Sequence, residues 1–146
     1  MLSLKSISLL GLSLAIIAMV TLVFRESLFA VGATTIVIQV LAALLMLWSR
    51  ITFGSRSFHA SAIPTEGGLA TSGPYKFLRH PIYASIIYFT WAGIAGHPAT
   101  INFLMGIAIT ASLFARIFAE EHLVAKQYPD YIIYAARTKR IIPFIF

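Results

Sequence analysis

The stretch "HPIYASIIYFTWAGIAGHPATINFLMGIAITASLFA", residues 80–115, contains no Asp, Glu, Lys or Arg. A membrane-spanning helix needs about 20 consecutive apolar residues, so this stretch is long enough for two spans. The turn-forming cluster Gly96-His97-Pro98 divides it near the middle. The stretch therefore predicts two membrane helices, at about residues 81–96 and 99–118, joined by a very short loop.

Two more uncharged runs precede this stretch, Ser6–Phe24 and Ser27–Ser49. They predict spans at about residues 6–24 and 27–48. The 146-residue chain is 59% hydrophobic and only 11% charged, whereas roughly a quarter of the residues of a soluble domain are charged. The expected fold is all-α: one integral membrane helical bundle over residues 1–146, with four transmembrane helices and a cytoplasmic amphipathic C-terminal segment.

A cleaved signal peptide is the alternative for the first run. Only Lys5 precedes this run, which is longer than the apolar core of about 7–15 residues that a signal peptide carries. We therefore expect a retained span. The chain has no cysteine, which excludes disulfides, thiolate catalysis and thiolate metal sites.

Lys and Arg residues predict the orientation of the four spans. With a cytoplasmic N-terminus, the outer loops hold Arg25 alone. The inner segments hold ten cations, namely Lys5, Arg50, Arg56, Lys76, Arg79, Arg116, Lys126, Arg137, Lys139 and Arg140. This positive-inside bias predicts that both termini are cytoplasmic. The net charge of +6 is then a topology signal that also attracts anionic membrane lipids, and it requires no nucleic-acid partner.

Arg79 and His80 directly precede Pro81, at the predicted start of a helix. Proline is favoured in the first turn because its missing N–H would have no partner within the helix. The free backbone N–H groups at a helix start attract anions, and Arg79 adds a positive charge there. We therefore expect an anion to bind at this helix start.

The last predicted span leads into charged and aromatic residues. Arg116 and Glu120 are four residues apart and share a helix face. An exposed ion pair of little consequence is the alternative reading. Tyr128, Tyr131 and Tyr134 recur every three residues, and interfacial anchoring is the alternative for them. The final "IIPFIF" is apolar enough to fold back against the bilayer or the bundle.

Metal binding is not expected from the four histidines, because His59, His80, His97 and His122 show no ligand spacing.

The motifs "GPYKFLRHPIY", "RIFAEE" and "YPDYIIYAARTKRIIP" follow one another between residues 69 and 143. In this order they resemble the isoprenylcysteine carboxyl methyltransferase family, to which membrane phospholipid N-methyltransferases are related. The resemblance implies a methyltransferase that uses S-adenosylmethionine, with its cofactor site on the cytoplasmic side. It also implies a lipid-like or prenylated acceptor that enters laterally from the membrane.

The resemblance also implies the site residues. Arg116 and Glu120 are the expected catalytic pair, in which Arg116 holds a carboxylate acceptor and Glu120 orients it. An amine acceptor would instead use a carboxylate to accept its proton. The expected cofactor-binding residues are Tyr75, Arg79, His80, Tyr83, Glu121, Tyr131, Tyr134 and Arg140. Arginine and histidine suit the cofactor's carboxylate, Glu121 suits a cationic group, and tyrosines suit the adenine or sulfonium.

The chain departs from the family pattern at two places. Ser85 stands where relatives usually have glycine, and Tyr128-Pro129 replaces a common aromatic-glycine pair. A carboxylate acceptor of isoprenylcysteine type is the first expectation, and phospholipid N-methylation is the alternative. Membrane sterol reductases share a related C-terminal half but use NADPH and generally have many more spans. A small lipid-binding or scaffolding bundle without catalysis is the remaining alternative.

Overall fold

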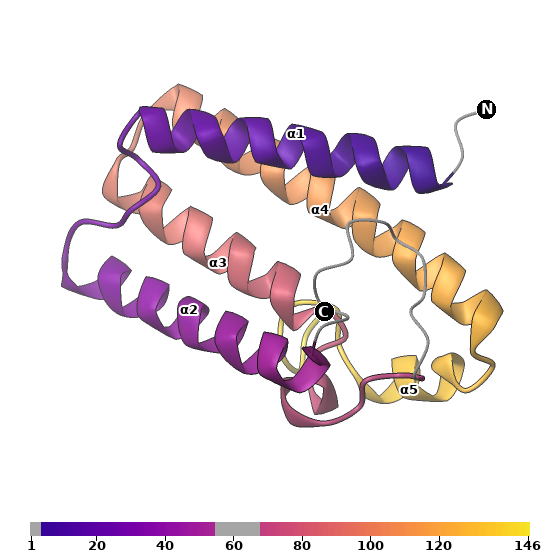
Figure 1. Ribbon diagram of the computed structural model, residues 1–146. Coiled ribbons are helices and arrows are strands. Elements are labelled where there is room, and N and C mark those ends of the chain that lie inside the picture. Colours follow the sequence, from indigo (N-terminus) through magenta and orange to yellow (C-terminus); the bar gives the residue numbers. More distant parts are fainter. Residues whose placement is uncertain (1–3, 55–67) are drawn as a thin grey trace.

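The computed structural model describes residues 4–54 and 68–146 (Figure 1). Its elements, in chain order, are α1 (Leu4–Phe24), α2 (Ala33–Phe53), the 3₁₀ helix η2 (Gly73–Lys76), α3 (Pro81–Gly96), α4 (Thr100–Gln127) and α5 (Tyr131–Arg137). These residues contain no β-strand, so the expected all-α fold is confirmed for the part of the chain that the structure describes.

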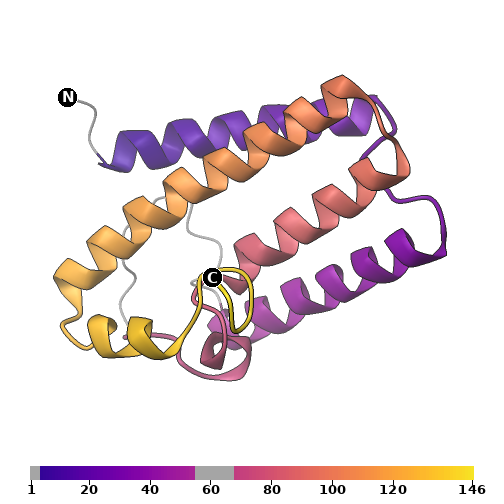
Figure 2. The same ribbon diagram turned by 180° about the vertical axis from the view of Figure 1, so that it is seen from behind.

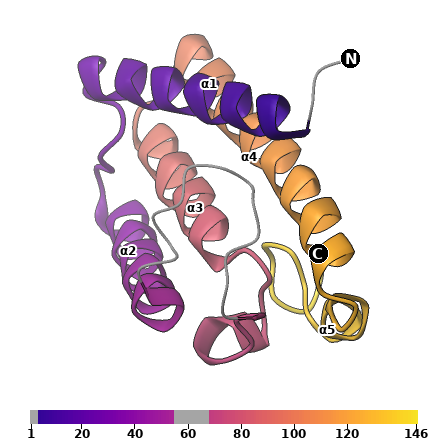
Figure 3. The same ribbon diagram turned by 45° about the vertical axis from the view of Figure 1, so that its right-hand side comes forward.

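The four long helices form two packed pairs. Helix α1 lies along α4, and α2 lies along α3 (Figure 3). Helices α3 and α4 meet beside the short turn that joins them and then diverge towards α5 (Figure 2). The end of the bundle that carries α5, with η2 and the start of α3, is called the α5 end here. The opposite end, with residues 25–32 and 97–99, is called the far end.

Three helices are long and apolar enough to cross a membrane by length and composition, and they cover Ser6–Phe24, Ala33–Phe53 and Thr100–Gln127. Large apolar side chains cover the outer surfaces of these helices, as expected for contact with lipid, including Leu10, Ile17, Leu41, Leu44, Phe103 and Ile107. Three of the four expected spans therefore have the length and composition to cross a membrane.

The second span was predicted too early, at residues 27–48. Helix α2 begins at Ala33 instead, and residues 27–32 form a loop. Gln39 holds this loop, because its side chain accepts a hydrogen bond from Ala30 N and donates one to Leu28 O. The loop runs directly over Gly93, where an added Cβ would lie 2.2 Å from the Leu28 carbonyl oxygen. An uncharged run does not distinguish such a loop from a helix.

Helix α3 begins and ends where the sequence predicts, but its 16 residues extend only about 24 Å. This is shorter than the hydrocarbon core of about 30 Å. Helix α4 has 28 residues and extends about 42 Å, well beyond the predicted end at residue 118. The additional turns of α4 carry Glu120 and Glu121 to the level at which α3 begins.

The charged side chains are distributed unevenly between the two ends. Arg25 lies at the far end, where its Nε donates a hydrogen bond to Asn102 Oδ1 over 2.8 Å. The other described cations belong to segments of the α5 end, namely Arg50, Lys76, Arg79, Arg116, Lys126, Arg137, Lys139 and Arg140. Arg56 and His59 lie outside the described residues, as does the side chain of Lys5.

Candidate functional site

A backbone pairing brings the C-terminal segment to the start of α3. Arg79 N donates to Lys139 O over 2.6 Å, and His80 N donates to Arg140 O over 3.0 Å. In return, Lys139 N donates to Phe77 O over 3.0 Å. The pairing places the Arg140 side chain beside the start of α3, although the two segments are far apart in sequence.

Glu121 lies at the start of α3, where the sequence predicts an anion. Its Oε1 is 3.1 Å from His80 Nε2 and 3.1 Å from Arg79 Nε, and its Oε2 accepts hydrogen bonds from Arg140 Nε and Nη2 over 3.1 and 3.0 Å. The Arg79 contact is ionic only, because that N–H does not point at the carboxylate. Arg79 Nη1 instead donates to Ala135 O over 2.9 Å.

A second group of side chains, formed by Tyr83, Arg116 and Glu120, lies beside the first. Tyr83 donates a hydrogen bond to Glu120 Oε1 over 2.5 Å, and Arg116 Nε donates to the Tyr83 hydroxyl over 2.8 Å. Arg116 Nη2 also lies 3.2 Å from Glu120 Oε1. Arg116 is only 4% exposed, which contradicts the alternative of an exposed surface ion pair.

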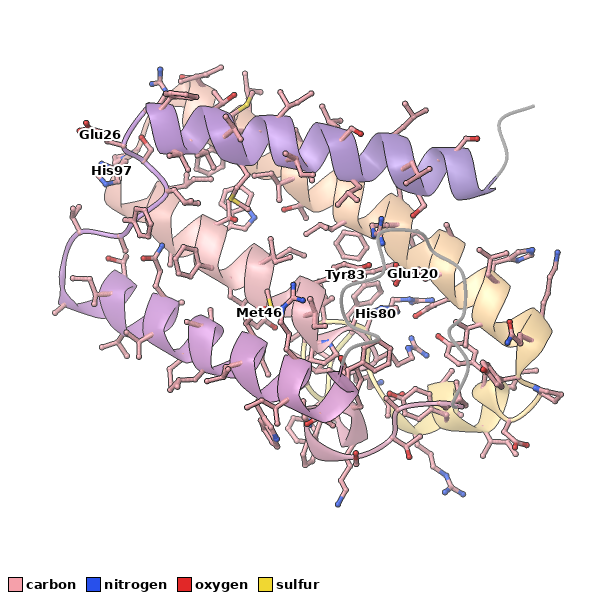
Figure 4. All side chains as sticks on the ribbon, viewed as in Figure 1. Glu26, Met46, His80, Tyr83, His97 and Glu120 are labelled. Atoms are coloured by element: carbon pink, nitrogen blue, oxygen red, sulfur yellow. The ribbon has the colours of Figure 1, made fainter. Side chains whose placement is uncertain are left out.

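His80 joins the two groups. Its Nδ1 is 3.9 Å from Glu120 Oε2, and its ring stacks on Tyr83 with centroids 5.7 Å apart. Figure 4 shows His80, Tyr83 and Glu120 gathered at the α5 end, whereas Glu26 and His97 lie at the far end. The expected catalytic pair and the residues around Glu121 are therefore one continuous polar cluster.

Two tyrosines of α5, Tyr131 and Tyr134, lie next to this cluster. Tyr131 is buried against Glu121, and its hydroxyl has no well-directed hydrogen-bond partner. Burial, together with the negative charge of Glu121, raises the pKa of Tyr131. Tyr134 donates to Tyr75 O over 2.8 Å, and burial raises its pKa to about 12. Both phenols therefore stay neutral at physiological pH and keep their protons for donation.

Tyr75 is placed differently from the other expected site residues. Its ring packs on Phe53 of α2 with centroids 5.5 Å apart, and its carbonyl oxygen is the group that receives the Tyr134 hydroxyl. Tyr75 is therefore buried between η2, α2 and α5, at the edge of the cluster.

Two phenylalanines that the sequence did not indicate as site residues also belong to the cluster. The Arg140 guanidinium lies 5.2 Å from the ring centroids of both Phe118 and Phe146, at cation–π distance. Phe118 precedes Glu120 by two positions, and this spacing alone does not indicate a site residue. No spacing in the sequence indicates that Phe146 folds back onto Arg140.

The cluster fits the cofactor that the sequence resemblance implies. Arg79, His80 and Arg140 gather at one place around Glu121, and this set of cationic and donor side chains is of the kind that binds a carboxylate. A neighbouring cleft of about 720 Å³ runs between residues 68–76 and α5, and its lining includes Lys76, Tyr128 and Tyr134. Its size is within the range of about 300–1,000 Å³ that small-molecule sites occupy.

Comparison with known proteins agrees with the motif order. A sequence model of the isoprenylcysteine carboxyl methyltransferase (ICMT) family matches residues 33–126, which include α2, α3 and nearly all of α4. No solved structure matches the chain at a significant level.

Two curated relatives carry names that refer to metals. The nickel-cobalt-cadmium resistance protein NccN of Alcaligenes xylosoxydans xylosoxydans is 34% identical over 80 residues, which cover 51% of this chain and 36% of NccN. The cobalt-zinc-cadmium resistance protein CzcN of Cupriavidus metallidurans is also 34% identical over 80 residues, covering 51% of this chain and 35% of CzcN. The match thus spans about a third of each relative.

Proposed function

This chain belongs to the isoprenylcysteine carboxyl methyltransferase family, and from that premise we propose that it transfers a methyl group from S-adenosylmethionine to a lipid-like acceptor at the cytoplasmic membrane face. The family implies a membrane methyltransferase. The observation that carries the proposal is the convergence of the start of α3, the end of α4 and the C-terminal segment on one buried polar cluster. The metal-resistance names of the two relatives, each matched over about a third of its length, are not transferred to this chain.

In this proposal, the residues around Glu121 bind the cofactor. Arg79, His80 and Arg140 provide positive charge and donors for its carboxylate, and Glu121 keeps these three side chains in place. The neutral phenols of Tyr131 and Tyr134 line the same side and offer aromatic surface and donors. When bound, S-adenosylmethionine supplies an already activated methyl carbon, so the protein mainly has to align donor and acceptor and exclude water.

The Arg116 group is the proposed acceptor side. We favour a carboxylate of isoprenylcysteine type, because Arg116 is the most buried cation of the cluster and a guanidinium pairs well with a carboxylate. The acceptor oxygen forms a bond to the methyl carbon, the carbon–sulfur bond breaks, and the electron pair stays on sulfur. No proton moves. An amine acceptor would have to release a proton, and Glu120 is the carboxylate in place to accept it.

Calorimetry with detergent-solubilised protein tests the cofactor site, and a product assay with one carboxylate and one amine surrogate tests the acceptor. For a carboxylate acceptor, Arg116→Ala should lower turnover far more than cofactor affinity. Arg116→Lys should restore only part of it, because an ammonium cannot reproduce the two parallel hydrogen bonds of a guanidinium. For an amine acceptor, Glu120→Gln should be the more damaging change.

Glu26→Gln at the exposed far end is the matched control and should leave both readouts unchanged. Failure of the wild-type protein to bind S-adenosylmethionine would contradict the proposal. Full turnover of the Arg116 and Glu120 variants on both surrogates would remove these two residues from the reaction and leave only the cofactor site.

A further inference from the structure

Two aromatic rings contact the guanidinium of Arg140 where it bonds to Glu121. The Arg140 Cζ atom lies 5.2 Å from the centroid of the Phe118 ring and 5.2 Å from that of the Phe146 ring. A guanidinium within about 6 Å of a ring centroid is attracted by the negative face of the ring. The Phe114 ring lies beside both, with centroids 6.3 Å from Phe118 and 5.9 Å from Phe146. Three rings thus form one aromatic group next to Arg140.

The sequence of α4 places two of these rings on the helix face that carries Glu121. Phe114, Phe118 and Glu121 follow one another at intervals of four and three residues, which is the spacing of side chains on one helix face. Arg116 comes two positions after Phe114, so it is turned away by about 200° around the helix axis. The aromatic group therefore belongs to the Glu121 side of the cluster, where the cofactor is proposed to bind, and not to the Arg116 side.

Glu121 engages only one edge of the Arg140 guanidinium. Arg140 Nε and Nη2 both donate to Glu121 Oε2, over 3.1 and 3.0 Å. These bonds use two of the five N–H donors of a guanidinium. The other edge, formed by Nη1 and the outer N–H of Nη2, has the geometry that binds a carboxylate through two parallel hydrogen bonds. The Arg140 side chain is 27% exposed, compared with 10% for Arg79, so Arg140 is the more accessible of the two arginines beside Glu121.

The rings restrict the Arg140 guanidinium without occupying its donors. The backbone of Arg140 is held by His80, whose N–H donates to Arg140 O over 3.0 Å, but a long side chain keeps rotamer freedom beyond a fixed backbone. Contact with a ring face leaves the N–H groups of a guanidinium available for hydrogen bonds, because these groups lie in its plane. Phe118 and Phe146 therefore limit the orientation of the guanidinium while its outer edge can still bind a ligand.

We propose that Phe118 and Phe146 are positioning residues of the cofactor site: their rings hold the Arg140 guanidinium so that the edge not used by Glu121 binds the carboxylate of S-adenosylmethionine. This inference rests on the proposed function. The two rings act through Arg140 and not by contact with the cofactor. Loss of either ring therefore weakens the binding of a cofactor that carries the carboxylate, and it does not affect a cofactor from which the carboxylate is missing.

Calorimetry with S-adenosylmethionine and with decarboxylated S-adenosylmethionine, which lacks only the carboxylate, tests this proposal. Phe118→Leu and Phe146→Leu keep an apolar side chain and remove the ring. Each should weaken the binding of S-adenosylmethionine about three- to tenfold, as expected for the loss of a cation–π contact, and should leave the binding of the decarboxylated form unchanged. Phe103→Leu is the matched control, because Phe103 is a ring of α4 that is as exposed as Phe118, at 53%, but contacts Trp91. It should change neither affinity.

Fluorination of the Phe118 ring provides a readout that a purely structural role would not change. Fluorine withdraws electrons from the ring face and nearly preserves the shape of the ring, so the affinity for S-adenosylmethionine should fall stepwise from phenylalanine to its mono-, di- and trifluoro forms. Equal affinities across this series, or equal losses for the two ligands in the leucine variants, would overturn the proposal and leave the rings as packing. A wild-type protein that binds neither ligand would contradict the proposed function, and this proposal with it.

Discussion

Glu121 has more charged partners than any other carboxylate of the cluster, because Arg79, His80 and Arg140 all contact it. Two of these partners belong to the start of α3 and one to the C-terminal segment. A single carboxylate thus offsets the repulsion between two guanidinium groups that are brought close together. Loss of its charge would leave the two arginines facing each other in a largely buried place, which is costly.

Glu121→Gln is therefore expected to weaken the binding of S-adenosylmethionine about tenfold or more, because at least one charge-assisted hydrogen bond of about 1.5–3 kcal/mol is lost. Calorimetry measures the affinity, and Glu26→Gln at the far end is the charge-matched control. Equal affinities for Glu121→Gln and the wild type would show that Glu121 does not organise the cofactor site.

Tyr83 is hydrogen-bonded to both Arg116 and Glu120 in the cluster. Tyr83→Phe should lower kcat/KM for the acceptor about tenfold, since a hydrogen bond to a charged group is worth about 1.5–3 kcal/mol, and should change cofactor affinity much less. A cycle with Glu120→Gln checks the contact. The two single effects should not add in the double variant, and additive effects would indicate that the two residues act independently.

Among the elements, α3 is the one most constrained by its neighbours. It lies between α2 and α4, and the loop of residues 27–31 runs against its last turn, at Gly93 and Gly96. Gln39 donates to both Leu28 O and Phe89 O and so ties this loop to α3. The backbone of the loop approaches the helix so closely that only glycine fits at position 93.

Gly93→Ala should destabilise the protein by about 1–3 kcal/mol or more, because an added Cβ would lie 2.2 Å from the backbone oxygen of Leu28. Thermal unfolding in detergent measures the effect. Gly106→Ala is the comparison, since its Cβ would meet the end of the Ile94 side chain and the edge of the Trp91 ring, and side chains can shift more easily than backbone. A larger loss for Gly106→Ala than for Gly93→Ala would contradict this account of the loop.

The helices themselves were largely predictable, because uncharged runs and the Gly96-His97-Pro98 cluster are local signals. The start of α2 was not, since it depends on side-chain bonds from Gln39 to the loop and on the close approach of the loop to Gly93, which is distant in sequence. At the site, the four-residue spacing predicted the pairing of Arg116 with Glu120. The apolar "IIPFIF" run predicted that the chain folds back after α5, but no short-range pattern indicates that this return brings Phe146 to Arg140.

For the molecule as a whole, the two ends of the bundle differ in chemistry. The far end has short loops and a small hydrogen-bonded group around Asn102, which receives Arg25 and donates to Ser27 and His97. The α5 end carries the polar cluster and most of the positive charge. Under the positive-inside rule, this asymmetry predicts that the α5 end is cytoplasmic.

Cysteine labelling can test that orientation without background, because the chain has no cysteine. In intact cells, a membrane-impermeant maleimide should label Glu26→Cys, at the far end. It should label Lys126→Cys, near the end of α4, only after permeabilisation. Both positions are exposed in the structure. The reverse pattern would contradict the cytoplasmic placement of the site.

The pairing of Arg79 with Lys139 also has a consequence for how the protein is made. Position 139 leaves the ribosome sixty residues after position 79, which takes about 3–12 s at 5–20 residues per second. During this interval, the start of α3 has neither its backbone partner nor Arg140 beside it. The site is therefore completed only after the four long helices that frame it have been synthesised.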